Sequence, residues 1–115
     1  DSFSLRPGGS ALAEFVATCI SHWRAQGGDP DVASRLPELL SARGWRLLSC
    51  RSLLDCSTSG EAKALWLQDF LSSYPQQLQQ QGLWSDEQQQ RLEAEQASAM
   101  LWMTPTLVEQ IWERP

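Results

Sequence analysis

Few side chains in this sequence are suited to catalysis. The one histidine, His22, provides neither a metal-ligand pair nor a cysteine–histidine pair that spacing would support. We expect it at the surface or its boundary, because the helix predicted around it already has a complete apolar face. The three cysteines show no CxxC spacing. We expect Cys19 and Cys50 to fill the core. Cys56 could be a reactive thiol, but nothing near it in the sequence would favour the thiolate.

The carboxylates and glycines show no arrangement typical of a catalytic or cofactor site. Glu93 and Glu95, for example, lie on opposite sides of a predicted helix. Gly8-Gly9 and Gly27-Gly28 lack the GxGxxG spacing and do not follow a strand, so no phosphate-binding loop is predicted. From the residues alone we predict no catalytic residue, no metal site and no cofactor-binding residue in this chain.

Aromatic residues are the unusual feature, with six tryptophans in 115 residues. Trp66, Phe70 and Tyr74 recur every four residues, which places them in one stripe along a helix, and Trp84 follows the turn at Gly82. Such a stripe is most often core, but these four residues could also form a pocket for an apolar or aromatic small molecule. Truncation to alanine separates the two interpretations, because core aromatics would cost about 3–5 kcal/mol each.

Composition limits the function classes. The length corresponds to a single domain, 1–115, and the 42% hydrophobic content suffices for a packed core. Nine basic and fourteen acidic residues give a net charge of −5, which argues against a nucleic-acid partner. An odd number of cysteines favours a reducing, cytoplasmic location. No signal peptide is visible, and no apolar run reaches the roughly 18 residues of a membrane span, so no membrane partner is expected.

The elements that must position these residues are mainly helices. Apolar residues from 12 to 23 recur with helical spacing and predict a one-faced helix that Ser10 caps and Gly27-Gly28 ends. A second helix is expected to run to about Arg43, with Pro37 in its first regular turn, because proline fits N1 but not a helix interior. Its leucines at 36, 39 and 40 are expected to face inward.

Further helical segments are predicted in the second half of the chain. A third helix is expected from about Glu61 to Tyr74, where Pro75 breaks it before a short helix that ends at Gly82. The sequence SDEQ, at 85–88, is a capping box that starts a glutamine-rich helix. Residues 1–9 and 55–60 are expected to be irregular, which leaves four to five helices.

Two strands are evident, near 45–54 and 106–113. Their antiparallel pairing would give an α+β fold, mostly helical with a small antiparallel sheet. A two-stranded sheet is marginally stable alone, and its edges are templates for further pairing. We therefore predict a homodimer, with a possible interface at Leu107, Val108, Ile111 and Trp112.

Four stretches carry a family resemblance. GGDPDVASRLPELLSARGW, at 27–45, is followed by WRLLSCRSLL, and the stretches LWSDEQQQRLEAE and MTPTLVEQIWERP come later. In order and wording they resemble the C-terminal half of class I S-adenosylmethionine-dependent methyltransferases: a helix before the sixth strand, that strand, a later helix, and the antiparallel seventh strand. The resemblance covers the chain from about Ser4 and includes no catalytic motif. Ala33 departs from the family, which often has glycine there.

The resemblance implies a chain without the methyl donor's binding site. The family binds S-adenosylmethionine (SAM) through a glycine-rich loop after the first strand and an acidic residue that ends the second, and neither occurs here. No residue therefore inherits a cofactor-binding role, and SAM is expected only together with a cofactor-binding N-terminal half. In the family, the part present here covers the substrate and shapes its pocket.

Three hypotheses follow. The chain is a non-catalytic helical binding or oligomerisation module that resembles the substrate-covering region of the methyltransferases. Alternatively, it is a fragment of an active methyltransferase, which the absence of an initial Met and the irregular start favour. A second alternative is a stand-alone protein-interaction domain without a ligand pocket.

Overall fold

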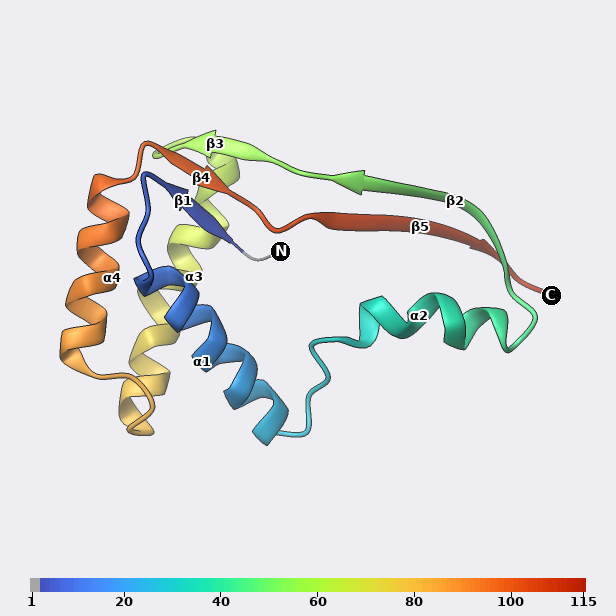
Figure 1. Cartoon of the computed structure of the whole chain (residues 1–115), viewed down its shortest axis with the longest axis horizontal. Coiled ribbons are helices and arrows are strands. Elements are labelled where there is room, and N and C mark those ends of the chain that lie inside the picture. Colours follow the sequence, from blue (N-terminus) through green and yellow to red (C-terminus); the bar gives the residue numbers. More distant parts are fainter. Residues whose placement is uncertain (1–2) are drawn as a thin grey trace.

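The computed structural model describes residues 3–115, which form a helical lobe and a projecting arm (Figure 1). The lobe comprises residues 3–28 and 55–104, and the arm comprises residues 29–54 and 105–115. The lobe contains α1 (Ala11–Ala25), α3 (Ala62–Gln80), α4 (Asp86–Ser98), β1 (Ser4–Arg6), β3 (Cys56–Thr58) and β4 (Leu101–Met103). The arm contains α2 (Val32–Ser41), β2 (Arg46–Leu53) and β5 (Leu107–Glu113). The predicted α+β class with four helices is confirmed.

Helix α1 begins and ends near the predicted residues, but another helix caps its start. Ser10 occupies the N-cap position, yet its hydroxyl donates to Glu14 Oε1 at 2.9 Å instead of accepting from the helix. The Ala11 backbone N–H donates to Glu95 Oε2 of α4 at 2.8 Å, so a long-range carboxylate satisfies one of the free amides of the first turn. At the other end Gly27 adopts φ +83°, which glycine accepts without a Cβ clash.

A second contact holds α1 against α4. Arg91 donates to Glu14 Oε2 at 2.6 Å, and this guanidinium lowers the pKa of the Glu14 carboxyl. The predicted capping box at the start of α4 is confirmed: Gln88 N–H donates to Ser85 Oγ at 3.1 Å, and Ser85 N–H donates to Gln88 Oε1 at 2.9 Å. The polar residues of α4 thus fix where the helix begins and which helix it contacts.

The prediction that Pro75 breaks the third helix is wrong. Helix α3 runs without interruption from Ala62 to Gln80, with Pro75 in its interior. The proline ring is buried, as are Leu71 and Leu78 on either side of it in sequence. Continuing the helix places these side chains in one apolar stripe, and the burial outweighs the backbone hydrogen bond that proline removes.

A three-stranded sheet in the lobe was not predicted. Its order is β1–β4–β3, antiparallel throughout, with Leu5 and Ser57 both opposite Trp102 of the central strand. Residues 1–9 and 55–60 are therefore not wholly irregular as expected, since each range contains a strand. Each of the three strands has only three residues, which is too short for the alternation that predicts a strand.

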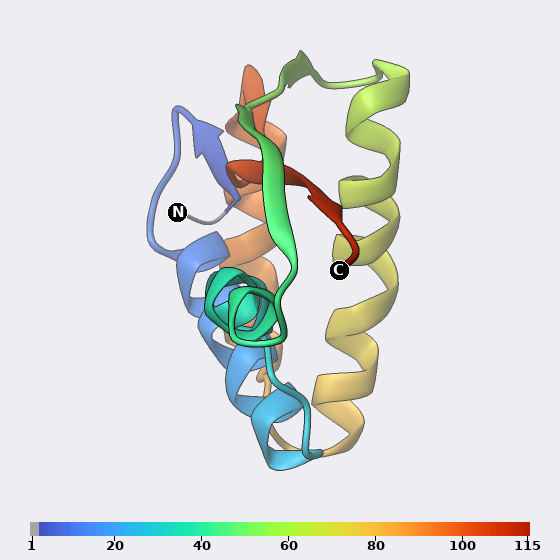
Figure 2. The ribbon, with the colours of Figure 1, turned by 90° about the vertical axis from the view of Figure 1, so that its right-hand side faces the viewer.

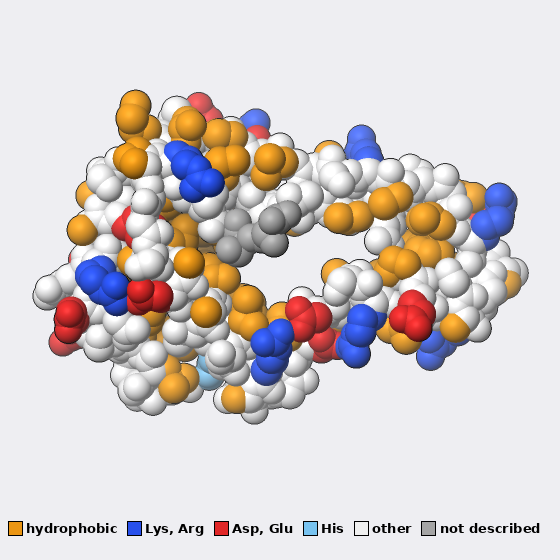
Figure 3. Space-filling view, in the orientation of Figure 1, with side chains coloured by type: hydrophobic (Ala, Val, Ile, Leu, Met, Phe, Trp, Pro, Cys, Tyr) orange, Lys and Arg blue, Asp and Glu red, His pale blue; other side chains and the backbone are white. Residues whose placement is uncertain are grey.

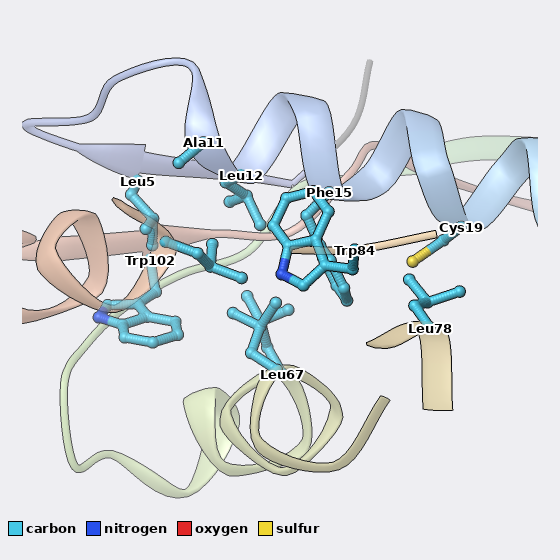
Figure 4. Close-up of a cluster of buried hydrophobic side chains, with 11 residues drawn as sticks. Leu5, Ala11, Leu12, Phe15, Cys19, Leu67, Leu78, Trp84 and Trp102 are labelled. Atoms are coloured by element: carbon cyan, nitrogen blue, oxygen red, sulfur yellow. The ribbon is translucent and has the colours of Figure 1, made fainter. Parts of the chain in front are cut away.

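The three lobe helices and this sheet enclose one hydrophobic core (Figures 2 and 4). Phe15 of α1 is fully buried at its centre, and Trp84, in the turn between α3 and α4, packs edge-on against it with ring centroids 5.3 Å apart. The rest of the core comes from every lobe helix and from β1 and β4: Leu5, Ala11, Leu12, Cys19, Leu67, Leu71, Leu78, Leu92 and Trp102. Figure 4 shows Trp84 between Leu12, Phe15 and Leu67.

In the arm, the predicted antiparallel pairing of the two longer strands is confirmed. Residue pairs run from Arg46 opposite Glu113 to Leu53 opposite Leu107, with an irregularity between Leu47 and Ser49. This sheet is separate from that of the lobe.

Helix α2 differs from its prediction in two ways. Pro37 lies in its interior, as the sixth residue, and not in the first turn, because the helix begins five residues earlier at Val32. The leucines expected to face inward are not covered, since Leu36 and Leu39 are 38% and 42% exposed. The arm has no opposing layer that would bury them.

Replacing the long-range cap tests how much the lobe depends on it. We expect Glu95→Ala to lower the free energy of unfolding by about 1 kcal/mol, because the Ala11 amide loses its acceptor. Urea denaturation followed by circular dichroism measures the change. The matched control is Glu93→Ala on the same helix, where the exposed carboxylate contacts only Gln89 in the described residues, and where a change below about 0.5 kcal/mol is expected. Equal effects of the two substitutions would contradict the capping role.

Candidate functional site

The four aromatic residues predicted as a possible pocket do not come together. Phe70, Tyr74 and Trp84 surround Phe15, with ring centroids 5.6, 6.4 and 5.3 Å from it. Trp84 is 3% exposed, and Phe70 and Tyr74 pack against the core from its edge. Tyr74 also accepts a hydrogen bond from Trp23 Nε1 at 2.6 Å. These three residues fill space around Phe15, as the core interpretation expects.

Trp66 lies apart from that cluster. It is 52% exposed and contacts Phe3 edge-on, with ring centroids 5.0 Å apart. A shallow groove beside it, of about 470 Å³, is lined by Trp66, Leu53, Leu54, Asp55, Lys63, Thr104 and Leu107. The groove lies where the arm joins the lobe and is lined by residues of both parts. It is therefore not a pocket formed by the four aromatic residues.

The residues with catalytic potential are dispersed. His22 is half-buried, as predicted for a residue at the boundary of the surface. Its ring lies beside that of Tyr74, with ring centroids 6.3 Å apart. Cys19 is buried as predicted, and burial raises the pKa of its thiol to about 12, which suppresses the thiolate. Cys50 is exposed, so its predicted place in the core is wrong: the arm has no core to receive it. Among residues 3–115, no group of histidine, cysteine and carboxylate side chains could hold a metal ion.

The arm is the candidate functional surface, and sequence reasoning recognised only its strands. None of its residues is buried, on the helix or on either strand. Most of its large apolar side chains are 38–61% exposed, whereas Leu40, Trp45 and Trp112 are half-buried. The exposed ones are Val32, Leu36, Leu39, Leu47, Leu48, Leu53, Leu54, Leu107, Val108 and Ile111. Apolar patches of this extent mark interaction sites on soluble proteins.

The overall dimensions agree with an uncovered arm. The radius of gyration is 16.9 Å, whereas a compact domain of this length has about 13 Å. The main packing between elements joins pairs within the lobe or within the arm. Figure 3 shows an opening through the molecule between the two parts, bordered by apolar side chains. A second groove, of about 560 Å³, separates α2 from β5 and is lined by Ala33, Ser34, Leu36, Pro37, Thr106, Leu107, Val108, Gln110 and Trp112.

Hydrogen bonds and ion pairs lie at the two junctions where the arm leaves the lobe. At one junction they join lobe residues to each other: Thr104 N–H donates to the Asp55 carbonyl at 3.1 Å, and Asp55 N–H donates to Thr104 Oγ1 at 3.1 Å. Lys63 binds the Asp55 carboxylate at 3.0 Å and lowers the pKa of that carboxyl. At the other junction Arg24 of α1 binds Asp31 of the arm at 2.6 Å, in an exposed ion pair. These contacts fix the points from which the arm extends, and the arm shares no core with the lobe.

Ion pairs also neutralise the arm internally. On the sheet, Arg51 binds Glu109 at 2.6 Å, and Arg46 binds Glu113 across the same pair of strands. Arg35 of α2 binds Asp29, which precedes the helix. The charged groups of the sheet are thus paired with each other, which leaves its apolar side chains as the groups that gain most from a partner surface.

The predicted interface residues lie on this arm. Leu107, Val108 and Ile111 are 56%, 54% and 51% exposed, while Trp112 is half-buried and donates from Nε1 to Gln110 Oε1 at 2.9 Å. Sequence reasoning missed the contribution of α2, whose exposed leucines extend the surface. The signal that could have found it is the apolar stripe of α2 next to a sheet too small to cover it.

Comparison of the chain with protein-family models, with curated protein sequences and with solved structures finds no match. The methyltransferase resemblance therefore stays a prediction. Within the part of the chain that the structure describes, none of the helices is long and apolar enough to cross a membrane.

Substitution of two tryptophans tests which of them contributes to the core and which lies at the surface. We expect Trp84→Ala to lower the free energy of unfolding by about 3–5 kcal/mol, because it empties the space beside Phe15. Trp66→Ala, at a side chain that is 52% exposed, is expected to cost less than about 1 kcal/mol. Urea denaturation measures both, and a Trp66 variant as unstable as the Trp84 variant would contradict the assignment.

Proposed function

We propose that this chain is a non-catalytic binding and oligomerisation module that acts through its arm and has no SAM site of its own. The observation that carries the proposal is the arm itself: a helix and a two-stranded sheet without a single buried residue, extending from a well-packed lobe. A chain that leaves this much apolar surface uncovered is built to be covered by another polypeptide.

The physical argument starts from the sheet. Two paired strands form hydrogen bonds between the backbone groups that face each other. They leave the backbone groups of both outer edges unpaired and both faces of the sheet to be covered. Stability requires at least a third strand or a packed layer. Helix α2 supplies only part of a layer, because its leucines stay half-exposed and a groove separates it from β5. An added polypeptide would complete both the sheet and the layer.

The resemblance supports the same function. In class I methyltransferases the segments similar to β2 and β5 are paired antiparallel at the end of a seven-stranded sheet, and here they pair antiparallel from Arg46–Glu113 to Leu53–Leu107. The described residues hold no glycine-rich loop after a strand, so the proposal includes neither methyl transfer nor cofactor binding by this chain alone.

The same pairing favours a second candidate, that the chain is part of an active SAM-dependent methyltransferase whose other half supplies the remaining strands. Its test is the reading frame that encodes the chain. An acidic residue followed by G-x-G, encoded in frame upstream of Asp1, would support this candidate, and a frame without that sequence contradicts it.

Association through the arm is the first measurable consequence of the proposal. We expect the wild-type chain to associate in sedimentation velocity experiments, and the triple variant Leu107→Ser/Val108→Ser/Ile111→Ser to be monomeric with an unchanged lobe. The matched control replaces exposed apolar residues of the lobe, in Leu65→Ser/Leu83→Ser/Met100→Ser, which are 49%, 45% and 73% exposed. Association that survives the arm substitutions, or that the lobe substitutions also remove, would contradict the proposal.

The absence of a cofactor site is tested by isothermal titration of the chain with SAM. We expect no binding heat, because the sequence has no glycine-rich loop of the G-x-G type to receive the cofactor. Micromolar affinity of the chain alone would show that it carries a cofactor site and would refute this part of the proposal.

A further inference from the structure

We infer that the partner of the arm is a second copy of this chain, which pairs antiparallel along the free edge of β5 about a two-fold axis through Gln110. The inference rests on the proposed function and specifies its partner and geometry. It follows from three features of the described residues: the protection of the strand edges, the register that symmetry imposes on β5, and the distribution of charge between arm and lobe.

The free edge of β5 lacks most of the features that protect strand edges from pairing. Exposed edges are normally blocked by charged side chains, above all lysine, by proline, by a bulge or by short length. β5 has seven residues, Leu107–Glu113, with neither lysine nor proline among them. Its two charged residues, Glu109 and Glu113, are each paired with an arginine of β2. The other long strand, β2, carries the irregularity between Leu47 and Ser49. The outer strands of the lobe sheet, β1 and β3, have three residues each. The edge of β5 is thus the one that is both long and regular.

Two-fold symmetry gives β5 a self-complementary register. With Gln110 opposite its copy, Val108 lies opposite Trp112, Glu109 opposite Ile111, and Leu107 opposite Glu113 of the second chain. No two like charges are directly opposite, which would be destabilising. Each glutamate is already neutralised within its own chain, by Arg51 at 2.6 Å for Glu109 and by Arg46 for Glu113. The pairing of a β-branched residue with an aromatic residue is among the favourable cross-strand combinations.

The pairing removes the structural weakness of the arm. Two copies form one continuous sheet of four strands, in the order β2, β5, β5 and β2, which exceeds the minimum of three for a stable sheet. The half-exposed apolar residues of β5 gain neighbours from the second copy on both faces, because side chains alternate along the strand. A closed, isologous contact of this kind ends at the dimer and leaves the bulged β2 edges outermost.

The distribution of charge favours contact between two copies of the chain through their arms. The arm carries five arginines and five carboxylates, a net charge of zero. The lobe, over residues 3–28 and 55–104, carries four basic and eight acidic residues, a net charge of −4. Two lobes repel each other, whereas two arms do not. The molecule is 51 Å long with the arm at one end (Figure 1), so contact through the arms keeps the acidic lobes apart.

The symmetry axis provides a sharp experiment, because a charge at position 110 meets the same charge in the partner. We expect the wild-type chain to sediment as a dimer, and Gln110→Lys and Gln110→Glu each to weaken dimerisation at least about tenfold. An equimolar mixture of the two variants is expected to restore a dimer, which native mass spectrometry identifies as the mixed species. Circular dichroism and urea unfolding of each variant verify the fold. Gln110→Glu keeps the oxygen that accepts from Trp112 Nε1, so its effect is attributed to charge.

The control is the same pair of substitutions at Gln76, an exposed glutamine of α3 in the lobe, where neither variant nor their mixture is expected to change the dimer. Dimers of both Gln110 variants as tight as wild type would overturn the inferred axis. If the Leu107/Val108/Ile111 variant nonetheless loses association, the proposed function survives with another geometry. A wild-type chain that stays monomeric at every concentration overturns the inferred partner. If it then binds a polypeptide carrying the methyltransferase N-terminal strands, the arm still functions as a binding module.

Discussion

A two-stranded sheet cannot bury its own side chains, and this constraint governs the structure of the chain. β2 and β5 pair over their full length, yet every residue on them remains accessible. Helix α2 cannot compensate, because a ten-residue helix covers one face in part and neither edge. The two strands pair the backbone groups between them but leave both outer edges and both faces open, and an added polypeptide would satisfy the edge hydrogen bonds and the hydrophobic burial together.

The lobe satisfies the same requirements without outside help. Its core draws on α1, α3 and α4, on the short sheet, and on Trp84 in the turn between two helices. Polar contacts then fix the arrangement, with Glu95 capping α1 and Arg91 binding Glu14 between the same two helices. The lobe therefore contains the buried core of the chain, and the Asp55–Thr104 and Arg24–Asp31 contacts lie at the two points where the arm leaves it.

The parts of the fold that sequence analysis predicted are those with strong local signals. The capping box at Ser85, the glycine at position 27 and the two strands near 45–54 and 106–113 each depend on nearby residues, and each is confirmed. The errors arose where tertiary burial overrides a local preference. Pro75 continues a helix because its ring is buried, and the three-residue strands exist because β4 carries Trp102 into the core. For the candidate site, the strand residues from Leu107 to Trp112 could be predicted, but the exposure of α2 and of Cys50 could not, because both depend on the absence of an opposing layer.

The distribution of chemical groups explains why the function of this chain is better sought in association than in catalysis. Catalysis requires polar groups that converge in a concave, partly desolvated site. Here the histidine, the cysteines and the carboxylates are dispersed, and the one cysteine held in the core is inactivated by its burial. The arm presents the opposite combination, with the charges of its sheet paired and its apolar side chains accessible. The cost of desolvating this surface is reduced because the charged groups of the sheet are already paired within one chain. Recognition through the arm then depends mainly on strand edge, register and shape, and these properties are encoded in β5.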